Sequence, residues 1–92
     1  MKLTSLVFHL SAKASRTLDA RGLSCPIPVF EVNKNIGQIS MGETLEVFAT
    51  DPAAAPDIKA WAERRGHLFL VAEPKNGCTR IVVKRNKQGS SS

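Results

Sequence analysis

The chain has 92 residues, enough for one small domain, since single domains commonly hold about 50 to 200 residues. Apolar residues make up 42% of it, too many for a disordered segment, yet no apolar run reaches the roughly 20 residues that span a bilayer. Thirteen Lys and Arg against eight Asp and Glu give a net charge of +5, which favours acidic partners. Two cysteines exclude a dense disulfide framework and indicate a reducing compartment, the cytoplasm, or thiol chemistry.

The two ends of the chain differ from its centre. Residues 1–15 combine a short apolar stretch with small polar residues, and we expect a loose arm or an extra strand there rather than a secretory signal. Residues 86–92 are polar and end in Gly-Ser-Ser-Ser, which predicts a flexible tail. The residues between them, 16–85, form the predicted domain.

The first half of that domain reads as strand, helix, strand. Residues 17–20 alternate apolar and polar side chains, as a short strand does. A helix follows, predicted by apolar residues spaced three and four apart: Val29, Val32, Ile36 and Ile39. Gly42 stands just past its expected end. Residues 45–49 alternate again and predict a second strand.

A second helix is expected to begin at Asp51-Pro52, with Asp51 as the cap and proline at the first helical position. Gly66 ends it, and its inner stripe is Ile58, Trp61, Ala62 and Arg65. Residues 67–73 and 78–84 predict two further strands, joined by a turn with the hairpin dipeptide Asn76-Gly77. The predicted fold class is α/β: a two-layer βαβαββ sandwich, with a four-stranded mixed sheet and two helices on one face.

The most informative residues are Cys25-Pro26-Ile27-Pro28. Pro26 suits the first helical position, which makes Cys25 the expected N-cap, at the positive end of the helix dipole. First-turn amides would then face the sulfur and lower its pKa, favouring the reactive thiolate. The alternative is that Cys25 packs as a small buried hydrophobe.

Other candidate residues carry weaker signals. His67, at a strand start, is expected to be structural, His9 lies in the arm, and Trp61 is expected in the core. Cys78 is either an inert strand residue or a resolving thiol for Cys25, which would require Cα atoms within about 7 Å. Two isolated cysteines lack the paired spacing of a zinc site, so we expect no metal and no cofactor.

Charged residues near the motif have open roles. Asp19 could brace the Cys25 loop, and Arg21 could raise the local potential or contact a partner. Basic residues are frequent in the second helix and near the end, but no aromatic residues that could stack bases lie among them: Lys59, Arg64, Arg65, Arg80, Lys84, Arg85 and Lys87. We expect no direct nucleic-acid binding, and a basic RNA-binding module is kept as an alternative.

The stretch from Leu18 to Val29, LDARGLSCPIPV, resembles the opening motif of the TusA/SirA-like sulfur-carrier family. The resemblance spans about residues 16–85 and continues at Gly42-Glu43, Thr50-Asp51-Pro52, Asp57-Ile58, Trp61 and Gly66-His67. It implies a two-layer βαβαββ sandwich resembling the C-terminal domain of initiation factor three.

The resemblance also implies a function centred on Cys25. Its thiolate would take the outer sulfur from a donor persulfide, on a cysteine desulfurase or rhodanese-like protein, and an acceptor sulfur-relay protein would remove it. Such a carrier would serve tRNA 2-thiouridine synthesis or a related pathway, and it is a sulfurtransferase if the relay counts as catalysis. No membrane association is expected. Besides the RNA-binding module, a thiol-disulfide regulatory protein using Cys25 and Cys78 is the other alternative.

Overall fold

The computed structural model describes residues 14–86. Within them the elements are β1 (Arg16–Ala20), α2 (Ile27–Ile36), β2 (Thr44–Ala49), α3 (Ala54–Arg65), β3 (Leu68–Lys75) and β4 (Cys78–Lys84). This is the predicted order of strands and helices. The predicted arm over residues 1–15 and the predicted tail over 86–92 lie outside the described residues, apart from residues 14, 15 and 86.

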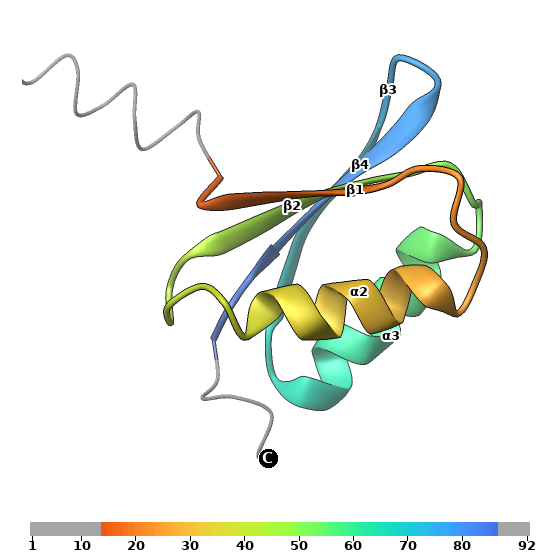
Figure 1. Ribbon diagram of the computed structural model, residues 1–92. Coiled ribbons are helices and arrows are strands. Elements are labelled where there is room, and N and C mark those ends of the chain that lie inside the picture. Colours follow the sequence, from red (N-terminus) through yellow and green to blue (C-terminus); the bar gives the residue numbers. More distant parts are fainter. Residues whose placement is uncertain (1–13, 87–92) are drawn as a thin grey trace, which may run out of the picture.

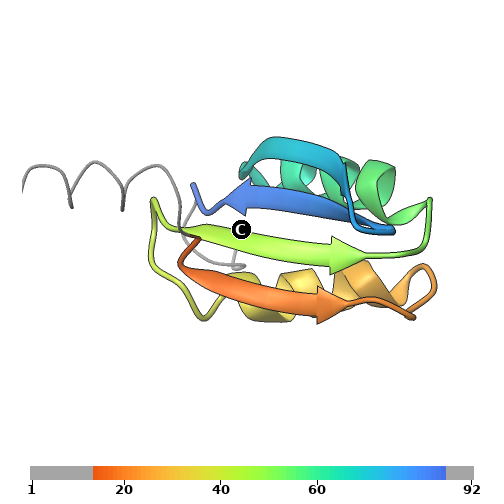
Figure 2. The ribbon, with the colours of Figure 1, turned by 90° about the horizontal axis from the view of Figure 1, so that it is seen from above.

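The strands form one mixed sheet in the order β1-β2-β4-β3. β1 runs parallel to β2, while β4 runs antiparallel to both of its neighbours. Both helices lie against the same face of this sheet, and no other element of residues 14–86 covers the opposite face, which we call the open face (Figure 1). Seen from above in Figure 2, the strands lie side by side over the two helices. The expected two-layer sandwich is therefore confirmed.

The core lies between the sheet and the helices. Alternate residues of β2 point into it, and helix residues three and four apart meet them, as the two periods of the sequence require. The side chains that lose essentially all contact with solvent include Val32, Leu45, Val47, Ile58, Ile81 and Val83. The sheet and both helices thus share one core.

Two turns follow directly from residue chemistry. Asn76 and Gly77 both have positive φ values, 45° and 84°, as the tight turn between antiparallel strands needs. Gly66 ends α3 in the left-handed conformation, with φ 81°. The predicted hairpin and the predicted end of the second helix are confirmed.

The first helix is shorter than predicted. It ends at Ile36, with Gly37 as its C-cap, instead of running past Ile39 to Gly42. Glycine is a poor helix former, so the helix stops at the first one it meets. Ile39 is nevertheless 6% exposed, because the chain after the helix folds back against the same core. The apolar spacing predicted burial correctly but helix length incorrectly.

One end of the sheet collects the residues of interest. The strands β1 and β2 are parallel, so both end there and both helices begin there. β4, being antiparallel to β2, begins at that end with Cys78. None of the helices between residues 14 and 86 has the length and apolar character needed to cross a bilayer.

Candidate functional site

Cys25 lies in the loop between β1 and α2, and its side chain is exposed. It is not the N-cap: that position belongs to Pro26, and α2 begins at Ile27, one residue later than expected. The Ile27 N–H donates to the carbonyl oxygen of Ser24 at 2.9 Å and closes a turn around Cys25. The Cys25–Pro26 peptide bond is cis. One of the amides expected to face the sulfur is thus already occupied by a backbone carbonyl.

Two carboxylates from the other half of the chain hold Cys25. Asp51 follows β2, and its Oδ2 accepts the backbone N–H of Cys25 at 2.7 Å. Asp57 lies in the first turn of α3, and its Oδ2 accepts the thiol proton of Cys25, with Sγ 2.6 Å away. Backbone and side chain of Cys25 are therefore both bound by acidic residues.

Asp51 has a different role from the predicted cap. The second helix begins at Ala54, and its N-cap, Ala53, makes no side-chain cap bond. Asp51 Oδ1 instead accepts the Ala53 N–H at 3.0 Å, in a turn before the helix, while Oδ2 reaches Cys25. These two backbone N–H groups hold the pKa of Asp51 below its usual value. Asp51 ties the start of α3 to the Cys25 loop.

The electrostatics at Cys25 are opposite to the expectation. Its pKa is raised, first by the hydrogen bond to Asp57, then by burial and by the charges of Asp57 and Asp51. The expected lowering by the helix N-terminus is therefore wrong. The physical reason is distance: a full negative charge in contact with the sulfur outweighs the partial charges of a helix end.

Two apolar side chains of the helix that follows Cys25 are exposed. Ile27 and Phe30, three residues apart on the first turn of α2, are 41% and 60% exposed. Pro28, on the other side of the helix, is buried and anchors that turn. Exposed apolar side chains next to a reactive group are typical of a protein-docking surface.

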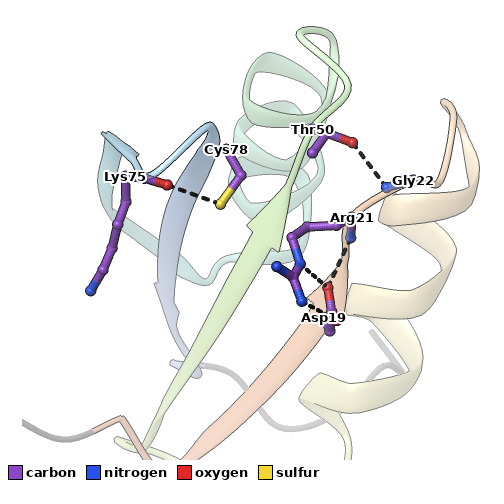
Figure 3. Close-up of polar contacts among 6 residues, drawn as sticks. All are labelled: Asp19, Arg21, Gly22, Thr50, Lys75 and Cys78. Atoms are coloured by element: carbon purple, nitrogen blue, oxygen red, sulfur yellow. Dashed lines mark hydrogen bonds and ion pairs between the residues drawn. The ribbon is translucent and has the colours of Figure 1, made fainter.

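Asp19 and Arg21 pair with each other. The Arg21 guanidinium donates to both carboxylate oxygens of Asp19, at 2.8 and 2.9 Å, and Figure 3 shows the side chain folded back along β1. The pair holds the pKa of Asp19 at about 2, chiefly through the Arg21 side chain. The next residue, Gly22, donates its N–H to Thr50 Oγ1 at 2.9 Å. This hydrogen bond ties the start of the Cys25 loop to the end of β2, and Asp19 Oδ1 also accepts the Arg21 N–H of the loop at 3.1 Å.

Cys78 occupies a separate place on the open face of the sheet. It alternates with the buried Ile81 and Val83 along β4, so its side chain points away from the helices. Its Sγ donates to the Lys75 carbonyl oxygen at 3.2 Å, as seen in Figure 3. A pocket of about 210 Å³ lies there, lined by Arg21, Phe48, Lys75, Asn76 and Cys78. The two thiols are both free and have different hydrogen-bond partners.

Two further candidates from the sequence, Trp61 and His67, are buried as expected, while His9 lies outside the described residues. Trp61 is 3% exposed and donates its indole N–H to Asn33 Oδ1 at 3.2 Å. His67 is 6% exposed, its ring centroid lies 5.3 Å from that of Trp61, and its Nδ1 accepts the N–H of Asn86. Both residues are structural and lie in or against the core.

Several basic side chains are neutralised locally. Arg80 contacts Glu46 at 2.5 Å and Glu73 at 2.9 Å, and Lys59 lies 3.8 Å from Glu63. Among residues 14–86, no three side chains of the metal-binding types come close enough together to hold an ion.

Asp57 is the site residue that sequence reasoning missed. The family resemblance includes the Asp57-Ile58 pair but gives Asp57 no role. A signal was present, because parallel β1 and β2 place the starts of both helices at the same end of the sheet. An acidic residue in the first turn of the second helix therefore falls near the loop that opens the first.

Known proteins share this sequence and fold. The family described as sulfurtransferase TusA matches residues 16–85. The sulfur carrier protein TusA of Allochromatium vinosum is 32% identical over 75 residues, which cover 82% of this chain and 99% of that protein. YrkF of Bacillus subtilis is 37% identical over 79 residues, 86% of this chain but 43% of YrkF, so the chain spans less than half of that relative.

The fold comparison agrees with the sequence comparison. The crystal structure of a SirA-like protein from Desulfitobacterium hafniense superposes with a TM-score of 0.68 at 25% identity, covering 78% of this chain and 99% of that one. The sheet order, the two helices on one face and the matched residues lie within the same segment, 16–85. The chain belongs to the TusA sulfurtransferase family, in which the Allochromatium vinosum relative is named a sulfur carrier protein.

Proposed function

We propose that this protein carries sulfur as a persulfide on Cys25. The observation that carries the proposal is the exposed Cys25 thiol at the end of the sheet where both helices begin, in a chain of the sulfur-carrier family. A carrier needs a thiol that two proteins reach in turn, and an exposed loop on a rigid two-layer scaffold meets that need.

The chemistry is an exchange of sulfur between thiols. Cys25 Sγ attacks the outer sulfur of a persulfide on a donor, which we propose to be a cysteine desulfurase or a rhodanese-like protein. The donor thiolate leaves, and an acceptor relay protein later removes the sulfur from Cys25 by the same kind of attack. Ile27 and Phe30, exposed in the first turn of the helix that follows Cys25, support docking of both proteins on one surface.

The destination of the sulfur depends on the acceptor. We propose tRNA 2-thiouridine synthesis or a related sulfur-trafficking pathway, as the family resemblance implies. Two free cysteines fit a reducing compartment, and we propose that the carrier works in the cytoplasm.

The test uses the two cysteines as matched controls. The protein is incubated with a cysteine desulfurase and cysteine, and its intact mass is measured before and after reduction. We expect Cys78→Ser to gain one sulfur atom that reduction removes, and Cys25→Ser to gain none. Sulfur retained in Cys25→Ser, or lost only in Cys78→Ser, would show that Cys25 is not the carrier thiol.

A further inference from the structure

The charged groups around the Cys25 thiol are acidic. Asp57 Oδ2 lies 2.6 Å from Sγ and comes from α3, while Asp51, from the loop after β2, holds the Cys25 N–H at 2.7 Å. The first turn of α2 adds no further carboxylate to these two. Arg21 lies in the same loop as Cys25, but its guanidinium is bound to Asp19. A chain with a net charge of +5 thus places two carboxylates at its exposed thiol.

This arrangement favours the thiol over the thiolate. The thiol donates a hydrogen bond to Asp57, and a thiolate would lose that bond and face two negative charges. The raised pKa of Cys25 has the same causes, with the Asp57 hydrogen bond first. Because the thiolate is the nucleophile, the carboxylate restrains the group on which sulfur transfer depends.

We propose that Asp57 is a specificity-determining residue: it keeps Cys25 protonated in the free carrier, and a docked donor displaces it before sulfur is transferred. The inference rests on the proposed function of Cys25. The donor that fits is one that brings a basic side chain to Asp57, since an ion pair gives the carboxylate a new partner in place of the thiol. Small electrophiles and oxidants bring no such group and meet a protonated thiol.

The transfer step balances without an oxidant or reductant. In the complex, Cys25 Sγ releases its proton and forms a bond to the outer sulfur of the donor persulfide. The donor's sulfur–sulfur bond breaks, and its electron pair stays on the donor sulfur, which takes up the proton. Cys25 then carries the persulfide and the donor is a thiol again.

The experiment compares two rates in a Cys78→Ser background, where Cys25 is the only thiol. The first is alkylation by iodoacetamide as a function of pH, and the second is sulfur gain from a persulfide-loaded cysteine desulfurase. We expect Asp57→Asn to move the midpoint of the alkylation profile to lower pH. Alkylation at pH 7 should then be faster by about tenfold for each pH unit that the midpoint moves. The rate with the desulfurase should rise much less, because the docked donor has already displaced the carboxylate.

Two variants serve as controls. Asp57→Glu retains a carboxylate on a flexible side chain and should keep the high midpoint. Glu73→Gln removes a half-exposed carboxylate that contacts Arg80 and not Cys25, while Arg80 stays bound to Glu46, and this variant should change neither rate.

The two roles proposed for Asp57 are contradicted by different results. An unchanged alkylation midpoint in Asp57→Asn would overturn the role of Asp57 in holding the proton. An equal gain with iodoacetamide and desulfurase would overturn its displacement by the donor. If the parent protein gains no sulfur at all, the proposed function fails, while the alkylation profile still decides whether Asp57 controls the thiol.

Discussion

Cys25 and Cys78 lie at the same end of one sheet, yet their surroundings differ in kind. Cys25 is exposed in a loop, with carboxylates from α3 and the β2–α3 loop bound to its thiol and backbone. Cys78 belongs to a strand, lies on the open face and donates to a main-chain oxygen. The same side chain therefore has different hydrogen-bond partners at the two positions: a residue three positions away binds Cys78, whereas distant parts of the chain bind Cys25.

The comparison also separates two kinds of charge arrangement. On the open face, Arg80 is paired with two carboxylates, and its side chain is 22% exposed. At Cys25, two carboxylates lie beside a neutral thiol. The first arrangement stabilises the fold, whereas the second leaves an acidic group available to a partner.

The largest loss of stability is expected from a substitution in the core that both regions share. Ile58 is fully buried and follows Asp57 in α3. Ile58→Ala should lower the free energy of unfolding by about 2–5 kcal/mol, because it removes buried methyl groups and leaves a cavity. Urea unfolding measures this. Leu70→Ala, at a position 49% exposed, should stay within about 0.5 kcal/mol. Equal losses in both variants would contradict the burial of Ile58 in the core.

A smaller loss of stability is expected from a substitution on the open face of the sheet. Arg80→Ala removes the guanidinium bound to Glu46, whose side chain is 18% exposed. We expect a loss of about 1–3 kcal/mol in unfolding free energy, between the values for exposed and buried pairs. The rate of Cys25 alkylation at neutral pH should not change, because Arg80 does not contact that site. A changed rate would show that the two regions are coupled.

The smallest effect is expected on the stability of the protein at acidic pH. Burial raises the pKa of Glu46, but hydrogen bonds from Arg80 and Thr17 outweigh it, and its pKa lies below the usual value of a glutamate. A carboxyl with a lowered folded pKa stabilises the protein above its unfolded pKa, and this contribution is lost as pH falls through the folded value. Urea unfolding should therefore become easier below about pH 4.5. Arg80→Ala should show a shallower dependence, and an identical slope would exclude Glu46 as its source.

The elements and the core were readable from local patterns. Alternation in residues 45–49 and three-four spacing in the second helix report which side chains are apolar on one face, and burial follows from that. Asn76-Gly77 is one of the few dipeptides that close a two-residue hairpin turn easily, so the hairpin was readable as well. The choice of Cys25 as the candidate thiol came from its motif.

The sequence by itself therefore determined the layers, the hairpin and the choice of Cys25 as the candidate residue. Only the tertiary structure decided the start of α2 and the pairing of Cys25 with Asp57, which lies 32 residues further along the chain. Periodicity describes one element at a time, whereas the contact between a loop and the first turn of another helix depends on how parallel strands bring both to one end of the sheet. That packing reversed the expected electrostatics of the thiol.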